Sequence, residues 1–124
     1  MTVIRHSDTR RTETPGGIMT TLASPTQGGS SLALWRVEMA PGKSGPRHYI
    51  DTEQVWTIIT GRADIDLDGT ALVAEAGDTA ILAADILRQI TCGPEGFTAI
   101  VTAPAGARAS TPDSDTAIVP PWIA

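Results

Sequence analysis

The stretch from Pro41 to Gly61 reads PGKSGPRHYIDTEQVWTIITG, and it says more about the fold than any other part of the chain. Its first half is rich in glycine and proline, a composition typical of turns. From Gln54 onward it becomes QVWTIIT, which is rich in β-branched and aromatic residues and therefore predicts a strand. His48 lies shortly before that strand. The stretch thus predicts a loop that places one histidine near the start of a β-strand.

The chain on both sides of this stretch shows the same β pattern. Leu32 to Met39 and Arg62 to Leu67 alternate between apolar and polar residues, and the Asp68-Gly69 pair is a strong hairpin signal. Turn signals recur roughly every 8–12 residues, as in an all-β sandwich or barrel, and no stretch has a helical period, so the predicted fold class is all-β. Further strands are expected at Val3–Ile4, Ile18–Leu22, Thr70–Ala74, Thr79–Leu82, Ile86–Thr91 and Phe97–Thr102.

A single domain over residues 1–124 is expected from the length of the chain. Within it we expect an N-terminal arm at 1–16, the core of the domain at 32–102 and a C-terminal tail at 103–124. The tail is polar up to Asp115 and apolar at Val119–Ile123. An apolar end after a polar stretch is expected to dock on the rest of the molecule.

The composition argues against several classes of partner. The net charge is −5 and only one of the nine basic residues is a lysine, which argues against nucleic acid. No apolar run approaches the roughly 20 residues that cross a bilayer, and the N-terminus has no apolar signal segment, so no membrane partner is expected. Cys92 is the only cysteine, so no disulfide forms within the chain. Together these features predict a cytoplasmic protein.

The spacing within Pro41–Gly61 resembles the first motif of the cupins. In that pattern a glycine is followed after five residues by a histidine, then by one residue and a second histidine. A glutamate follows, then six residues and a closing glycine. Gly42, His48 and Gly61 match the pattern, whereas Ile50 holds the position of the second histidine and Gln54 that of the glutamate.

A second cupin motif is matched in spacing from Gly77. Its pattern is a glycine, five residues, a proline, one residue, a glycine, two residues and a histidine. Ala83, Asp85 and Arg88 stand at the proline, second glycine and histidine positions. The chain thus resembles the small single-domain cupins of the cupin-2 type, with a degenerate metal site. The resemblance implies a single β-barrel of the double-stranded β-helix or jelly-roll type, with its core at residues 32–102.

Of the metal ligands that the resemblance implies, only His48 remains. Ile50 has no donor atom, Gln54 offers only a neutral carbonyl oxygen, and Arg88 carries a permanent positive charge. We therefore expect no metal and no cofactor. An atypical metal site would need other ligands beside His48, from among His6, Asp51, Glu53 and Cys92. The acidic series Asp64, Asp66 and Asp68 is explained by the solvated face of a strand that ends in a hairpin.

Alternation along the strands predicts which side chains line the barrel interior. They are Trp35, Val37, Met39, His48, Ile50, Gln54, Trp56, Ile58, Arg88 and Ile90. Only His48, Gln54 and Arg88 are polar, and we expect them to converge in a mostly apolar cavity, which is the composition of a small-molecule site. A buried arginine would need an anionic partner from the protein or from a ligand.

The same residues also have plainer interpretations. His48 fits a residue at a strand start that is hydrogen-bonded to a loop, and Gln54 fits a residue that satisfies backbone groups. Arg88 fits a side chain in solvent, or one paired with Asp51, Glu53 or Asp85. Trp35 and Trp56 fit the core of the domain.

Three functions follow from these residues. The first is a metal-independent enzyme of the isomerase, cyclase or lyase type, acting on a small anionic or carbonyl-containing compound. His48 would be its general acid or base, Arg88 would stabilise charge on a substrate oxygen, and Gln54 would orient the substrate. The resemblance supports this reading, since similar small cupins include polyketide cyclases and isomerases of secondary metabolism. The alternatives are a non-catalytic ligand-binding module and a metalloenzyme with an atypical site at His48.

A homodimer is also predicted. Leu34, Thr57 and Ile59 lie on the outward parity of their strands. Together with the N-terminal arm and the apolar C-terminal segment, they give an apolar exterior that a second copy would cover.

Overall fold

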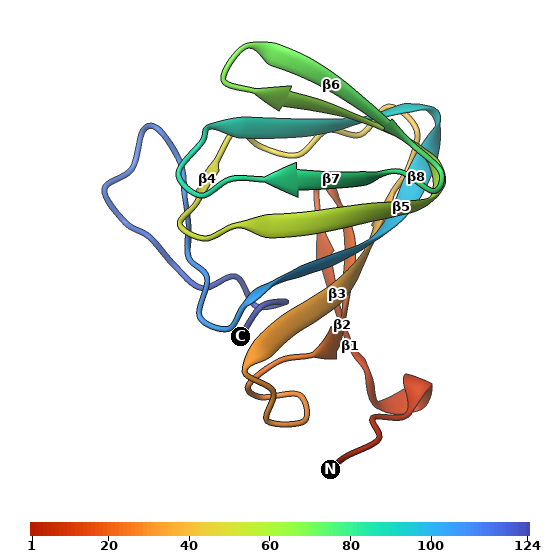
Figure 1. Cartoon of the computed structure of the whole chain (residues 1–124), viewed down its shortest axis with the longest axis vertical. Helices are drawn as coiled ribbons and strands as arrows, with labels where there is room; N and C mark the ends of the chain where they lie inside the picture. The colour runs from red at the N-terminus through yellow and green to blue at the C-terminus, as the bar shows by residue number, and fades with distance from the viewer.

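The computed structural model describes all 124 residues, and its regular structure is almost entirely antiparallel strands (Figure 1). Seven strands form one sheet in the order β1-β2-β3-β8-β5-β6, with β7 paired to β5, and β4 pairs with β9. The predicted all-β class is thus confirmed. No helix is long and apolar enough to cross a bilayer. The elements are the 3-10 turn η1 (His6–Asp8) and the strands β1 (Arg10–Thr14), β2 (Gly17–Ala23), β3 (Leu32–Met39), β4 (Tyr49–Ile50), β5 (Gln54–Leu67), β6 (Thr70–Glu75), β7 (Thr79–Leu82), β8 (Arg88–Pro104) and β9 (Ala109–Ser110).

Two long strands, β5 and β8, hold the fold together. The sequence predicted each of them as two shorter strands, and that prediction was wrong. Both strands continue through a bend, and the register between them shifts on either side of Gly61. Gly61 and Gly96 have φ of +76° and +73°, a conformation that glycine adopts without strain. A Cβ on Gly61 would lie 2.0 Å from the carbonyl oxygen of Gly96, so the close approach of the two strands requires a glycine there.

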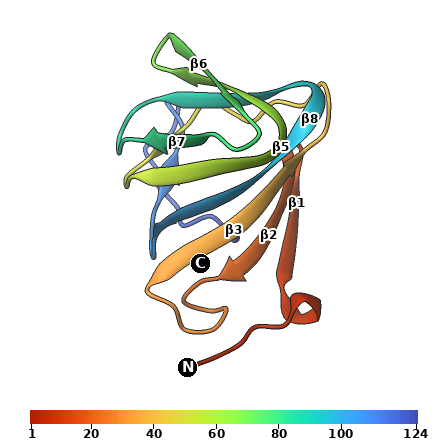
Figure 2. The same cartoon turned by 45° about the vertical axis from the view of Figure 1, so that its right-hand side comes forward.

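The N-terminal segment also differs from the prediction. The expected strand at Val3–Ile4 does not form, and the second half of the expected arm forms β1, which pairs with β2 from Arg10↔Thr21 to Thr14↔Gly17. Figure 2 shows β1, β2 and β3 side by side, with β1 at the edge. The sequence of β1 is RRTET, which has no apolar residue. Such a sequence is tolerated at the edge of a sheet, where a strand need not bury either face completely.

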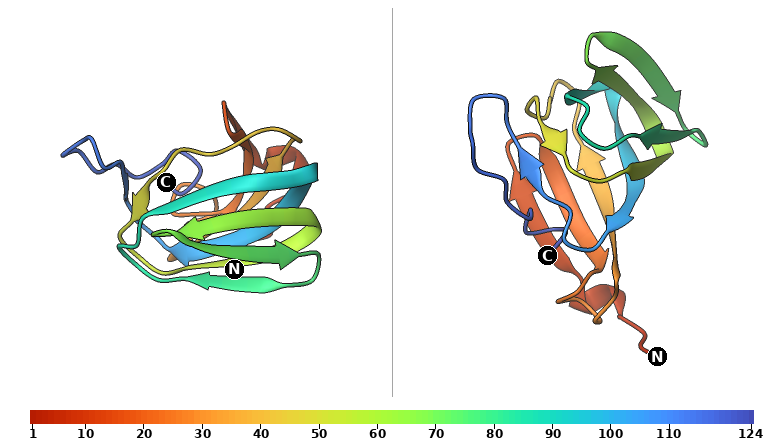
Figure 3. Two further views of the ribbon diagram at one scale, coloured as in Figure 1. Left: turned by 90° about the horizontal axis from the view of Figure 1, so that it is seen from above. Right: turned by 60° about the vertical axis from the view of Figure 1, so that its left-hand side comes forward.

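The core lies between the two halves of the bent sheet, and the C-terminal segment packs against it. Ile123 is fully buried, and the hydroxyl of Thr21 on β2 donates to the carbonyl oxygen of Trp122 at 2.9 Å. The main-chain oxygen of Ala124 accepts a bond from the Ser24 hydroxyl at 2.6 Å. In Figure 3 this segment, in blue, runs beside β4 and returns to the first strands. The predicted docking of the apolar end is confirmed.

Candidate functional site

A cavity of about 830 Å³ lies beside β3, β5 and β8. Eight of the ten residues predicted to line the interior do line it. Trp35, Val37 and Met39 come from β3, Gln54 and Trp56 from β5, Ile90 from β8, Ile50 from β4, and His48 from the loop just before β4. Apolar side chains therefore make most of this wall, as expected of a site for a small organic molecule.

Two of the predicted lining residues lie elsewhere. Ile58 is fully buried in the core, further along β5 toward the bend at Gly61, and does not reach the cavity. Arg88 is 1% exposed and is not among the lining residues either. Strand parity gave the correct inward direction for both. It did not show how far along the strand the cavity extends.

The opposite wall was missed by the sequence reasoning. It is formed by the C-terminal segment, with a contribution from the turn between β1 and β2. The residues are Ala109, Ser110, Thr111, Ser114, Thr116, Ile118, Pro120, Pro121 and Trp122, together with Thr14, Pro15, Gly16 and Met19. The apolar end of the tail was a signal for docking, but nothing in the sequence showed that it docks over the cavity.

His48 lines the cavity, and its ring has one nitrogen without a partner in the protein. Its Nδ1 lies 2.8 Å from the carbonyl oxygen of Pro46. A carbonyl oxygen only accepts, so Nδ1 carries the proton and Nε2 keeps its lone pair. Burial lowers the pKa of the imidazole; the bond to Pro46 opposes this, and the positive charge of Arg88 lowers the pKa further. His48 is therefore a neutral base whose free nitrogen is Nε2.

Gln54 is oriented by two donors. The indole nitrogen of Trp56 and Nη1 of Arg88 each lie 3.3 Å from Oε1 of Gln54. Both partners can only donate, so the atom that faces them must be the amide oxygen and not the amide nitrogen. Nε2 of Gln54 then has no partner in the protein. Only two side-chain atoms are both fully enclosed and without a partner, namely Arg10 Nε and Thr52 Oγ1. The amide nitrogen of Gln54 has no partner and is not one of them, so it is not fully enclosed. Because Gln54 lines the cavity, we place this nitrogen at the cavity.

Arg88 lies behind Gln54 and binds oxygen atoms only. Its Nη2 donates to the carbonyl oxygen of Ala83 at 2.8 Å, and its Nε donates to that of Ile86 at 3.1 Å. It has no ion pair, since the ion pairs of the structure are Arg11–Glu13, Arg36–Glu38 and Arg62–Asp64. Burial lowers the pKa of the guanidinium, whereas the charge of Asp85 raises it. The predicted anionic partner is thus replaced by carbonyl dipoles, and neither solvent nor a carboxylate holds this side chain.

The residues at this site do not fit the metal that the cupin motifs imply. Ile50 supplies no donor, Oε1 of Gln54 already accepts two hydrogen bonds, and the guanidinium of Arg88 would repel a dication. No group of three His, Cys, Asp or Glu side chains lies together anywhere in the chain. We therefore derive no chemical step through a metal.

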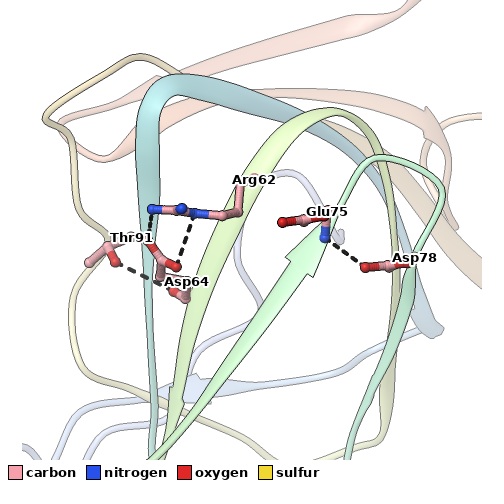
Figure 4. Close-up of polar contacts among 5 residues, drawn as sticks. All are labelled: Arg62, Asp64, Glu75, Asp78 and Thr91. Atoms are coloured by element: carbon pink, nitrogen blue, oxygen red, sulfur yellow. Dashed lines mark hydrogen bonds and ion pairs between the residues drawn. The ribbon is translucent and has the colours of Figure 1, made fainter.

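The acidic residues of β5 and of the turn between β6 and β7 are engaged in local contacts. In Figure 4 the carboxylate of Asp64 pairs with Arg62, 3.3 Å from its Nε, and Asp78 accepts from the backbone N–H of Glu75 at 2.9 Å. The carboxylate of Asp66 accepts from the backbone of Gly69 at 2.7 Å, within the hairpin. These contacts agree with the interpretation of the acidic series as a solvated strand face.

The site therefore combines one acceptor and one donor group in an apolar setting. Nε2 of His48 can take a proton, and the amide hydrogens of Gln54 can bind an oxygen that gains negative charge. A low-dielectric wall strengthens both interactions. Such a pair is suited to moving a proton on a compound that carries a carbonyl or hydroxyl oxygen.

Comparison with known proteins gives one family match. A family model described as the cupin domain matches residues 35–92, which contain both motifs and the cavity residues of β3, β4, β5 and β8. No curated protein matches the sequence.

Several solved structures share the fold. The polyketide cyclase RemF from Streptomyces resistomycificus is 20% identical with a TM-score of 0.71, and the alignment covers 84% of this chain and 79% of that one. An RmlC-like cupin from Shewanella frigidimarina is 22% identical with a TM-score of 0.69, covering 82% and 89%. Oxalate decarboxylase from Bacillus subtilis is 20% identical with a TM-score of 0.71, covering 81% of this chain but 28% of that one. At these identities the likeness shows the fold alone.

Proposed function

We propose that this chain, whose residues 35–92 match the cupin domain model and whose fold is shared with cupin structures, is a metal-independent enzyme of the isomerase, cyclase or lyase type. Its substrate is a small carbonyl-containing organic compound bound in the cavity. The observation that carries the proposal is the pairing of a neutral, lowered-pKa His48 with the free amide nitrogen of Gln54 in one apolar cavity.

The proposed chemistry is a proton transfer next to a carbonyl group. Nε2 of His48 takes a proton from the carbon beside the carbonyl, and the electron pair of that C–H bond moves to the carbonyl oxygen. The amide hydrogens of Gln54 bind this oxygen as it becomes negative. The imidazolium then returns the proton to another atom of the enolate. In a cyclisation the enolate carbon instead attacks a second carbonyl, whose π bond breaks as the C–C bond forms, and the resulting alkoxide takes the proton from the imidazolium.

The cavity walls support a flat, mostly apolar substrate. Trp35 and Trp56 are among the lining residues, and Val37, Met39 and Ile90 add to the apolar surface. The fold shared with a polyketide cyclase is in keeping with this substrate class. The sequence predicted that the substrate oxygen would bind Arg88, whereas the position of Arg88 behind Gln54 favours Gln54 as the donor.

The experiment is a hydrogen-exchange assay on 2-acetylnaphthalene, a flat aromatic ketone with exchangeable methyl hydrogens. In D₂O we expect the protein to accelerate deuterium uptake, and His48→Asn to reduce the rate by about 10²–10⁴-fold. Asparagine is a suitable replacement because its amide nitrogen can still donate to Pro46, as Nδ1 of His48 does, while no base remains.

The outcomes separate the candidate functions. Binding of the ketone without any exchange, with affinity unchanged in His48→Asn, would assign the chain as a non-catalytic ligand-binding module. Exchange that depends on a copurified metal would assign the atypical metalloenzyme, and metal analysis of protein prepared without a histidine tag identifies it directly. A cytoplasmic location remains a prediction from the sequence.

A further inference from the structure

Arg88 is the one large charged side chain that the fold buries completely, at 1% exposed. Enclosing a cation costs free energy unless it is paired, and Arg88 has no ion pair. Two of its nitrogens bind the carbonyl oxygens of Ala83 and Ile86, which hold the guanidinium plane in place. The third nitrogen, Nη1, is directed at Gln54. The positive charge is therefore fixed immediately behind one cavity residue.

Gln54 connects this charge to the cavity. Its Oε1 accepts from Arg88 and Trp56, and its Nε2 is open to the cavity. A charged donor on the oxygen of an amide draws electron density away from the nitrogen, which makes the N–H groups stronger donors. The same contact prevents the amide from turning over, since a turned amide would put two N–H groups against the guanidinium.

We infer that Arg88 is a positioning residue that acts through Gln54: it holds the amide with its hydrogens in the cavity and makes this point selective for an oxygen that carries or gains negative charge. The ligand class is a phenol, an enol or an enolisable ketone. The inference deepens the proposed function, because it concerns the same cavity and names what the donor side of it recognises.

The probe is 2-naphthol, a flat two-ring compound whose neutral and ionised forms differ in absorbance. Its ionisation is titrated by absorbance when free in solution and when bound to the protein. For the wild-type protein we expect the bound probe to ionise at lower pH than the free probe, by about one pKa unit or more, which is a tenfold preference for naphtholate. The measured quantity belongs to the probe, so a purely structural role of Arg88 would not alter it.

Three variants isolate the contribution of Arg88. Arg88→Met keeps an unbranched side chain of similar width and removes the charged guanidinium, so the naphtholate preference is expected to fall by about tenfold. Arg88→Lys keeps the charge and is expected to recover part of the preference. Trp56→Phe removes the neutral donor to Oε1 and is the matched control, with an expected loss several-fold smaller than that of Arg88→Met because a charged donor is the stronger of the two.

Gln54→Glu is the test that does not require the arginine to be removed. Arg88 and Trp56 can still donate to one carboxylate oxygen, so folding is expected to persist, while the other oxygen now faces the cavity as an acceptor. The preference is expected to reverse, with neutral naphthol bound more tightly than naphtholate. A thermal melt of each variant reports on folding.

The inference is overturned if Arg88→Met binds naphtholate with the wild-type preference. If Arg88→Met does not fold, the same result in Gln54→Glu overturns it. It is also overturned if the wild-type protein does not lower the pKa of the bound probe. The proposed function fails separately. If the bound naphthol has a lowered pKa but 2-acetylnaphthalene does not exchange, the role of Arg88 is supported and the enzyme is rejected. If 2-acetylnaphthalene exchanges but the variants leave the pKa of bound naphthol unchanged, the enzyme is supported and the role of Arg88 is rejected.

Discussion

Single residues decide the chemistry that we propose for this chain, and His48 is the clearest case. Its position in the sequence is that of a metal ligand in the cupin pattern. In the structure its surroundings make it a neutral base, because Nδ1 is bound to Pro46 while burial and Arg88 both disfavour the imidazolium. The same side chain is therefore available for proton transfer, where a metal-bound histidine would have no free lone pair.

The lowered pKa of His48 predicts how activity depends on pH. A histidine of ordinary pKa would be half protonated near pH 6.5, whereas His48 is expected to remain a base there and to lose activity only in more acidic solution. The acid limb of the exchange rate for 2-acetylnaphthalene should therefore fall below pH 6.5. An NMR titration of the imidazole, assigned with His48→Asn, checks the pKa directly, and a value above 6.5 contradicts the account.

Stability should follow the same group. When the chain unfolds, His48 regains its ordinary pKa, so between about 6.5 and the lower folded value the unfolded state binds more protons than the folded state. This contribution leaves the free energy of unfolding constant above pH 6.5 and reduces it as the pH falls through the folded pKa. Chemical denaturation at several pH values should show a weaker acid dependence in His48→Asn than in the wild-type protein.

At the scale of elements, the bend of β5 and β8 places the site. Below the bend, Gln54 and Trp56 face the cavity, and beyond it the same strand pairs with β6. The bend depends on Gly61, whose φ is +76° and whose missing Cβ leaves room for the carbonyl oxygen of Gly96. Register, and with it the direction of every side chain on β5, therefore depends on this glycine.

Substitution of Gly61 tests this dependence. Gly61→Ala is expected to lower the free energy of unfolding by more than about 4 kcal/mol, since the new Cβ would collide with a backbone oxygen. Gly69→Ala is the matched control, because Gly69 also has a positive φ, +90°, but has nothing within 4 Å of a Cβ. It should cost only about 1–2 kcal/mol, the penalty of the left-handed conformation. Equal losses in urea denaturation would show that the close contact is not what holds the bend.

The C-terminal segment is the second element that shapes the site, since it forms the outer wall of the cavity. Ile123 anchors it and is fully buried. Ile123→Ala is expected to lower the free energy of unfolding by about 2–5 kcal/mol. Hydrogen exchange should also become faster over residues 111–122, while β3 stays protected. Unchanged exchange in that segment would mean that the anchor lies elsewhere.

The sequence predicted the local features of these elements but not the contacts between distant segments. The strand at Leu32–Met39 was placed correctly to its ends, and parity put Trp35, Gln54 and Ile90 on the cavity side, because alternation is a local property. The continuity of β5 and β8 was missed, since a glycine inside a strand has the same local signal as a turn. The wall at Ala109–Trp122 and the position of Arg88 behind Gln54 depend on contacts between distant segments, which no local pattern contains.

At the scale of the whole molecule, the outer face of the sheet carries exposed aliphatic side chains. Ile59 and Ile81 are 52% and 67% exposed, and Ile81 lies opposite Val55 in the pairing of β7 with β5. Leu34 and Thr57, the other residues predicted for a dimer face, are half-buried. We propose that a second copy of the chain covers this face, because exposed aliphatic side chains gain free energy by burial.

The dimer is tested by solution scattering or sedimentation. The wild-type protein is expected to have twice the mass of the chain at micromolar concentration, and Ile81→Asp to have the mass of one chain. Val73→Asp, on β6 and 59% exposed, is the control and should leave the dimer intact. A wild-type monomer would contradict the proposal, and the cavity of a single chain would then be the complete site.

The most direct test of the account concerns the metal. The deuterium exchange of 2-acetylnaphthalene is measured with protein dialysed against a strong chelator, then again after Zn²⁺, Fe²⁺, Mn²⁺ or Ni²⁺ is added back. If His48 and Gln54 carry out the proton transfer by themselves, the rate of the chelated protein equals that of the untreated protein, and no added ion increases it. A rate that disappears on chelation and returns with one of these ions would contradict the account.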